Sequence, residues 1–174
     1  MADAFHQYHL HDDAQGNEPG IMLASMEVHD QFVLFGRIAL ATGLGYLIGL
    51  EREYWGKTAG DRTFALLALG SAAFVGLGVE LFPLTADRVI QGVAAGVGFL
   101  GAGIIFRGDQ DGGPKGLTTA AASWAVAAIG ALAGAGVLWT PIMVTALVIV
   151  ILESQRLSFI RRIGQKRRTP PPNS

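Results

Sequence analysis

Long apolar stretches alternate with short polar segments along most of the chain, and their lengths predict membrane-spanning helices. Residues 32–50, 63–82 and 89–106 are almost entirely apolar. Each is close to the roughly 20 residues that a helix needs to cross a bilayer. Pro83 ends the second stretch and leaves only a short connection to the third. The pattern predicts three transmembrane helices in the first two thirds of the chain.

The last apolar stretch, residues 117–152, runs for 36 positions without a charge. This is too long for one crossing, so we expect two helices that break around Gly134, Gly136 and Pro141. The composition agrees, because 51% of the residues are hydrophobic and only 16% are charged, against about 25% charged in soluble domains. The chain is therefore predicted to be an all-α membrane protein with five transmembrane helices.

The basic residues predict how these helices are oriented. Five helices place the N-terminal tail and two short turns on one face of the membrane, where Arg88 is the only lysine or arginine. The opposite face receives Arg52, Lys57, Arg62, Arg107, Lys115, Arg156, Arg161, Arg162, Lys166, Arg167 and Arg168. Since cytoplasmic segments carry the excess of lysine and arginine, we expect the N-terminus outside and the C-terminus in the cytoplasm.

The two ends differ from the membrane domain, predicted for residues 31–153. Residues 1–30 are acidic, contain all four histidines and have no lysine or arginine, so we expect a disordered tail. The alternative is a transition-metal site formed by His6, His9, His11, Asp12 and Asp13. Residues 154–174 mix basic and apolar positions before a proline-rich end, which predicts an amphipathic segment on anionic lipid.

The third predicted helix is rich in glycine, at Gly92, Gly96, Gly98, Gly101 and Gly103. In a bilayer such small residues allow another backbone to approach closely, and Gly92 with Gly96 forms a GxxxG pair. We expect helix packing here, and a homodimer through the GxxxG face is the sharper interpretation. The alternative is a packing face and nothing more.

Two charged residues lie inside the predicted membrane region near its outer side. Arg37 is about 8 Å inside the first helix at 1.5 Å per residue. Glu80 lies at a similar depth near the outer end of the second helix. We expect an intramembrane ion pair between them, with outward snorkelling of the arginine as the alternative.

Another group of charges follows the first helix on the cytoplasmic side. Glu51, Arg52 and Glu53 either form a charge network with Arg62 across the loop or offer oxygens to a divalent cation such as Mg²⁺. The alternative is a solvated helix end. Beyond the third helix, Thr118 and Thr119 are expected to cap the fourth helix. With Gly116 they could instead present a helix N-terminus to an anion or a partner.

The order of several sequence blocks resembles the MgtC/SapB family of bacterial inner-membrane proteins. These blocks are IGLERE at 48–53, GDRT at 60–63, GVGFLGAGIIF at 96–106, GLTTAA at 116–121 and SW at 123–124. The resemblance covers roughly residues 33–152 and implies a five-helix membrane domain. The chain ends soon after the fifth helix, whereas longer members carry a cytoplasmic C-terminal domain. Asp61, Thr85 and Ala125 also depart from the family pattern.

The resemblance implies a candidate site for an ion or a partner at the cytoplasmic face. Its residues are Glu51, Arg52, Glu53, Gly60, Arg62, Thr63, Gly116, Thr118 and Thr119.

The family resemblance also implies a function. We expect a non-enzymatic regulator linked to low magnesium and intracellular survival, acting on other membrane complexes such as the F-type ATP synthase. The alternative is a magnesium transporter or channel, which should keep acidic residues near the midplane, and the last three predicted helices have none. No nucleophile and base pattern indicates an enzyme. We expect no cofactor other than possible Mg²⁺, and lipid, a second copy or another membrane complex as partners, but no nucleic acid.

Overall fold

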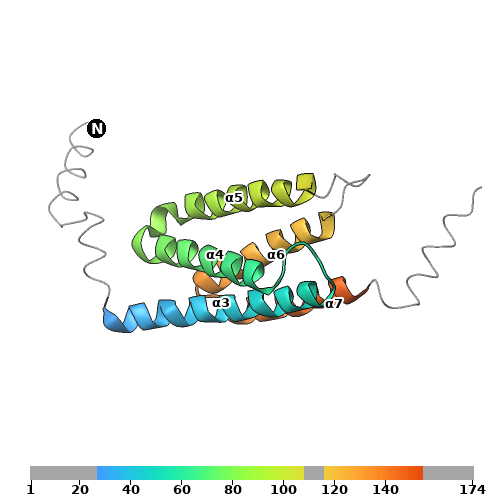
Figure 1. Ribbon diagram of the computed structural model, residues 1–174. Helices are drawn as coiled ribbons and strands as arrows, with labels where there is room; N and C mark the ends of the chain where they lie inside the picture. Colours follow the sequence, from blue (N-terminus) through green and yellow to red (C-terminus); the bar gives the residue numbers. More distant parts are fainter. Residues whose placement is uncertain (1–26, 108–115, 155–174) are drawn as a thin grey trace, which may run out of the picture.

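The computed structural model describes residues 27–107 and 116–154, and its regular structure there is helical, without strands. The elements in these ranges are α3 (Val28–Tyr54), α4 (Asp61–Leu81), the 3-10 turn η1 (Pro83–Thr85), α5 (Ala86–Arg107), α6 (Leu117–Gly134) and α7 (Trp139–Glu153). Successive helices run in opposite directions, so the start of α3 and the end of α7 lie at opposite ends of the bundle (Figure 1). The predicted all-α class with five helices is confirmed for the described residues, while its orientation in the membrane stays a prediction. The predicted histidine metal site and the basic C-terminal tail lie outside these residues.

Helix α3 is longer than the hydrophobic stretch that predicted it. It begins at Val28 and ends at Tyr54, so its 27 residues extend for about 40 Å at 1.5 Å per residue. The hydrocarbon core of a bilayer is only about 30 Å thick. Glu51, Arg52 and Glu53 therefore belong to the last helical turn of α3 rather than to a polar segment that follows it.

The predicted break in the last apolar stretch is present between α6 and α7. Gly136 has a φ of +87°, a conformation that glycine adopts without strain. Pro141 lies in the first turn of α7, where its missing N–H leaves no helical hydrogen bond unmade.

Four of the helical segments are long and apolar enough to cross a membrane, namely α3, α4, Pro83–Phe106 and α6. Helix α7 is a shorter apolar helix of 15 residues.

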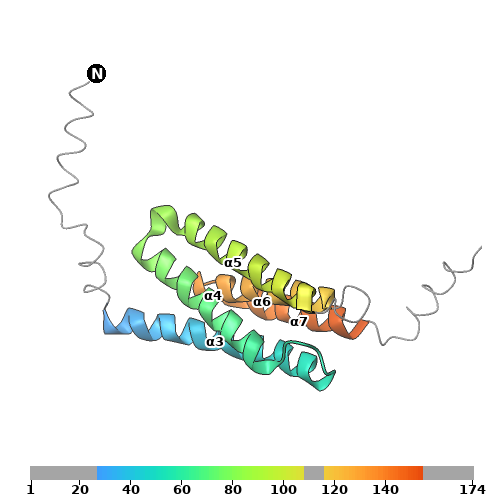
Figure 2. The same cartoon turned by 45° about the horizontal axis from the view of Figure 1, so that its top comes forward.

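The core is built from α3, α4 and α6. Figures 1 and 2 both place α4 and α6 between α5 and α3. The buried residues of this core are Ala41, Leu44 and Ile48 of α3, Phe64, Ala68 and Ala72 of α4, Ala122, Val126, Ile129 and Ala133 of α6, and Leu152 of α7, with Ala59 from the α3–α4 loop. Of the 18 residues of α6, 56% are buried, but only 11% of the apolar 18-residue segment within Pro83–Phe106, which includes most of α5, is buried. Helix α5 therefore lies at the side of the bundle and contributes no residue to this core.

Glycines make the closest helix contacts, but not those that the sequence predicted. A Cβ at Gly45 of α3 would lie 2.6 Å from the Phe64 carbonyl oxygen, and one at Gly130 of α6 would lie 2.5 Å from the Ala68 carbonyl oxygen. At Gly134 a Cβ would collide with the Ala72 carbonyl. These positions need glycine because backbones cross there without room for a methyl group.

The predicted packing glycines of α5 are mostly open within this chain, so their role in packing against a second copy stays a prediction. A Cβ at Gly92, Gly96, Gly98 or Gly103 would meet nothing within 4 Å. Gly101 faces α6, where a Cβ would be in ordinary contact, 3.7 Å from the Ala120 Cβ. Within the chain, the helices cross instead at the GxxxG pairs of α3 and α6.

Candidate functional site

Arg52 is buried at the end of α3 although it is charged. Only 3% of the residue is exposed, because Arg52 continues the face that buries Ala41, Gly45 and Ile48 at helical spacing. Its Nε and Nη2 donate to the two carboxylate oxygens of Glu51 over 2.5 and 2.9 Å. A bidentate, hydrogen-bonded pair is the arrangement that lets a guanidinium and a carboxylate remain charged inside a protein. The end of α3 is therefore a built ion pair and not a solvated helix end.

Glu53 reaches from α3 to the beginning of α4. Its Oε2 accepts a hydrogen bond from the Asp61 backbone N–H over 3.1 Å, and a carboxylate is favourable at this positive end of a helix. Gly60 is the N-cap residue of α4, and a Cβ there would lie 2.6 Å from the same Glu53 oxygen. Glycine at this position leaves room for the carboxylate. The backbone N–H of Arg62 donates to Oδ1 of Asp61 over 2.6 Å, whereas the predicted charge network between Arg62 and the glutamates stays a prediction.

The remaining predicted residues of α4 and α6 lie at the same end of the bundle (Figure 1). Arg62 and Thr63 are exposed in the first turn of α4. Gly116, with φ of +90°, is the N-cap of α6, and no side chain caps this helix. Thr118 is exposed in the first turn of α6, whereas Thr119 is buried. The expectation that these threonines cap α6 is wrong, because Gly116 takes the cap position itself.

A shallow pocket lies against the α3–α4 corner. It has a volume of about 620 Å³ and is lined by Leu50, Glu51, Glu53, Tyr54, Trp55, Asp61 and Glu153. Within residues 27–107 and 116–154, no group of three or more histidine or acidic residues has an arrangement that could hold a metal ion. The Tyr54 and Trp55 rings meet edge to face with centroids 5.0 Å apart. Tyr54 is 81% exposed, so this corner presents aromatic surface.

Arg37 and Glu80 are brought together at the opposite end. Nη1 of Arg37 lies 2.9 Å from Oε1 of Glu80, and the side chains are 22% and 33% exposed. Gly136 in the α6–α7 turn packs against this guanidinium, since a Cβ there would lie 3.2 Å from the Arg37 Cζ. The pair therefore joins α3 and α4 next to the turn between α6 and α7. Nothing in the sequence predicted that the left-handed turn at Gly136 would contact Arg37.

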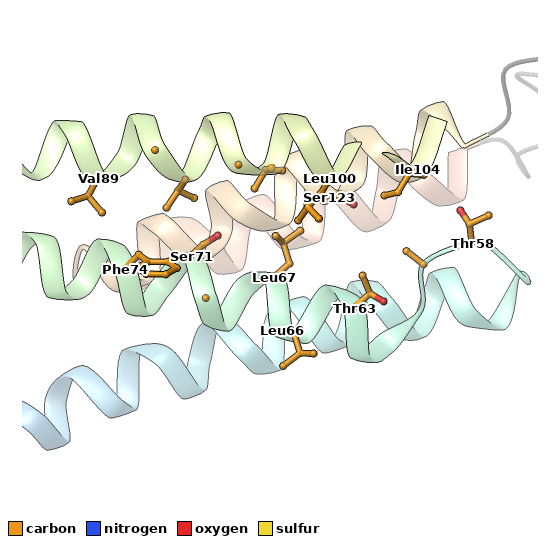
Figure 3. Close-up of a pocket in the computed structure, with 16 residues that line it drawn as sticks. Thr58, Thr63, Leu66, Leu67, Ser71, Phe74, Val89, Leu100, Ile104 and Ser123 are labelled. Carbon is orange, nitrogen blue, oxygen red and sulfur yellow. The ribbon is translucent and has the colours of Figure 1, made fainter. Parts of the chain in front are cut away.

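A larger groove lies between α4 and α5, and sequence reasoning missed it. It has a volume of about 880 Å³, with α4 on one side, α5 on the other and α6 behind (Figure 3). Gly92 and Gly96 of α5 line it opposite Gly70 and Phe74 of α4. Its polar lining consists of the hydroxyl groups of Thr58, Thr63, Ser71 and Ser123. The only available signal was the number of glycines in α5, which we interpreted as a packing face.

The sequence has relatives among known proteins. Residues 38–158 match the MgtC family. The SrpB protein of Synechococcus elongatus is 38% identical over 165 residues, which cover 79% of this chain and 88% of that protein. The MgtC proteins of Salmonella typhimurium and Brucella abortus are 43% and 41% identical over 93 and 112 residues. Neither name denotes an enzyme. No solved structure matches the chain.

The relatives differ in how much of their length is matched. The aligned part covers 53% of this chain but 39% of the Salmonella protein, and 62% of this chain but 45% of the Brucella protein. The aligned part therefore spans less than half the length of these two relatives.

Proposed function

Because this chain belongs to the MgtC family, we propose that it is a non-enzymatic regulator in the bacterial inner membrane. It adapts the cell to low magnesium by acting on another membrane complex, with the F-type ATP synthase as the leading candidate. Four apolar helices of sufficient length and the family match make it a multi-pass membrane protein. The regulatory role, the identity of the partner and the location in the inner membrane are what we propose.

Regulation is favoured over ion transport because the candidate carboxylates already accept hydrogen bonds from within the protein. Glu51 is held by two hydrogen bonds from the buried Arg52, and Glu53 accepts from the α4 backbone at Asp61. These groups stabilise the corner between α3 and α4. A cation there would have to compete with charged or backbone donors that are already in place.

The same corner presents surface that suits a protein partner. Tyr54 is 81% exposed and Trp55 is 44% exposed. Lys57 and Arg62 are exposed beside them in the chain. Tyrosine, tryptophan and arginine are enriched among the residues that dominate protein interfaces. The Glu51–Arg52 ion pair fixes the end of α3, and the exposed rings of Tyr54 and Trp55 next to it form the surface on which we expect a partner protein to dock.

A binding measurement tests this proposal. The full chain in nanodiscs is titrated with purified F-type ATP synthase, and saturable binding is expected. Tyr54→Ala should weaken binding by about tenfold or more, as expected for an exposed anchor. Trp139→Ala is the matched control, because Trp139 is 79% exposed at the other end of the bundle. Equal binding by both variants would remove Tyr54 as an anchor, and no binding by the unmodified chain would remove the synthase as the partner.

The second candidate function is transport of a divalent cation, which the acidic lining of the pocket at the α3–α4 corner favours. Liposomes containing the purified chain and a magnesium-sensitive dye test it beside a known magnesium channel. Magnesium entry that disappears in a folded Glu53→Gln variant would make the protein a transporter. An absence of entry, while the control channel conducts, would leave the regulatory function standing.

A further inference from the structure

We propose that the groove between α4 and α5 binds one acyl chain of an anionic phospholipid, with the headgroup at the end formed by Thr58 and Thr63. The proposal rests on three observations, which are the unfilled apolar walls, the size of the groove and the charge at its mouth. It is independent of which membrane complex the protein regulates.

The walls of the groove leave space that the protein does not fill. Gly70 on α4 and Gly92 and Gly96 on α5 line it, and a Cβ at any of them would meet nothing within 4 Å. The other lining residues are mostly aliphatic, such as Leu67 and Leu100. In a bilayer the material that reaches such a surface is hydrocarbon, and it gains dispersion contacts by filling the space.

The groove is at least as long as one leaflet. On α4 the lining extends from Thr63 to Phe74, about 16 Å, and on α5 from Val89 to Ile104, about 22 Å at 1.5 Å per residue. Half of a hydrocarbon core of about 30 Å is about 15 Å. An acyl chain whose headgroup lies near Thr63 would therefore end near Phe74 (Figure 3).

A helix of a second copy fits the groove less well. The groove is closed at the end beside η1, where α4 and α5 meet and a Cβ at Gly78 would lie 3.0 Å from Val89 Cγ2. A thin, flexible chain can enter a groove that narrows in this way.

The charges at the mouth favour an anionic headgroup. Lys57 and Arg62 are exposed and adjoin the lining residues Thr58 and Thr63 in the chain. Asp61 precedes Thr63 by two residues, or about 200° around the helix, and its backbone lies against Gly49 of α3. The acidic group therefore faces α3, away from the groove. Basic residues at the edge of a pocket between transmembrane helices are a typical headgroup site.

Native mass spectrometry of the full chain in micelles containing equal amounts of phosphatidylglycerol and phosphatidylcholine tests the proposal. One phosphatidylglycerol per chain should remain bound. Gly96→Phe and Gly70→Phe fill the groove from opposite walls, and each should lower lipid binding by about tenfold or more, since most of the buried hydrocarbon contact is lost. Gly98→Phe is the matched control, because Gly98 is equally open but does not line the groove.

The headgroup is tested separately with Lys57→Gln/Arg62→Gln. This variant should lose roughly thirtyfold in affinity for phosphatidylglycerol while its affinity for phosphatidylcholine stays the same. Circular dichroism and a single peak in size exclusion show that each variant is folded. Equal lipid binding by Gly96→Phe, Gly70→Phe and Gly98→Phe would overturn the proposal. So would a groove variant that abolishes dimers in the same mass spectra without changing lipid binding, since a second copy would then be the occupant.

Discussion

Gly130 and Gly134 of α6 and Gly92 and Gly96 of α5 are two pairs of glycines with the same spacing and opposite surroundings. The α6 pair presses against the α4 backbone at Ala68 and Ala72, whereas the α5 pair faces open space. The α6 pair lets α6 enter the core, while the α5 pair leaves a groove. The spacing of small residues permits close approach, and the rest of each helix decides whether it happens.

The largest expected effect is the difference in stability between the same substitution made in the α6 pair and in the α5 pair. Gly134→Val should destabilise the fold by about 3 kcal/mol or more, because the added carbons collide with the Ala72 carbonyl. Gly92→Val enters open space and should change stability by less than about 1 kcal/mol. Unfolding of both variants in mixed detergent micelles measures the difference. Similar losses would show that the two helices are packed alike.

The buried ion pair at the α3–α4 corner gives the next largest effect. The side chains of Arg52 and Glu51 are only 4% and 10% exposed. Arg52→Met therefore leaves a buried Glu51 carboxylate without its guanidinium partner. We expect a loss of about 3 kcal/mol, measured by the same unfolding experiment. Glu51→Leu/Arg52→Met, which removes both charges, should recover part of that loss. A double variant as unstable as the single one would show that the loss does not come from the Glu51 charge left behind.

The Arg37–Glu80 pair at the other end should contribute less, because its side chains are less buried than those of Glu51 and Arg52. Its side chains are 22% and 33% exposed, so Glu80→Gln should cost about 0.5 to 1 kcal/mol. The loss should shrink in high salt, which screens exposed pairs. Thermal unfolding in detergent at low and high salt measures both effects, and an unchanged melting temperature at low salt would remove the pair from the stabilising contacts.

The smallest effect is expected where a methyl group is added in open space. Gly98→Ala in α5 adds a methyl group in open space and should stabilise the helix by about 0.5 kcal/mol, since alanine restricts the unfolded chain. Gly45→Ala in α3 should destabilise, because its Cβ would lie 2.6 Å from the Phe64 carbonyl oxygen. Melting temperatures that move in the same direction would erase the distinction between tight and open glycines.

The sequence predicted the helices well because apolar length and the absence of charge directly reflect the bilayer. It placed the α6–α7 break close to Gly136, where the backbone takes a left-handed turn. The pairing of Arg37 with Glu80 was also anticipated from depth alone, and the structure places the two groups 2.9 Å apart. Arguments from distance along a helix axis need no knowledge of which helices are neighbours.

The sequence failed where the answer depends on rotation about the helix axis. Arg52 was interpreted together with its charged neighbours, but its spacing of four residues from Ile48 places it on the buried face. The glycines of α5 were assigned to packing, yet which helix crosses which is decided by the whole bundle. The groove along α4 and α5 was missed for the same reason, because it depends on how both helices are placed in the bundle.

The difference in length between α3 and α7 has a mechanical consequence for the surrounding lipid. The 27 residues of α3 and the 15 residues of α7 correspond to about 40 and 22 Å of helix. The apolar part of α3, residues 32–50, is about 28 Å long and matches a hydrocarbon core of about 30 Å, so the mismatch lies at α7, beside which we expect the bilayer to thin. Such hydrophobic mismatch makes the protein favour thin membrane and biases which neighbours gather along its short side.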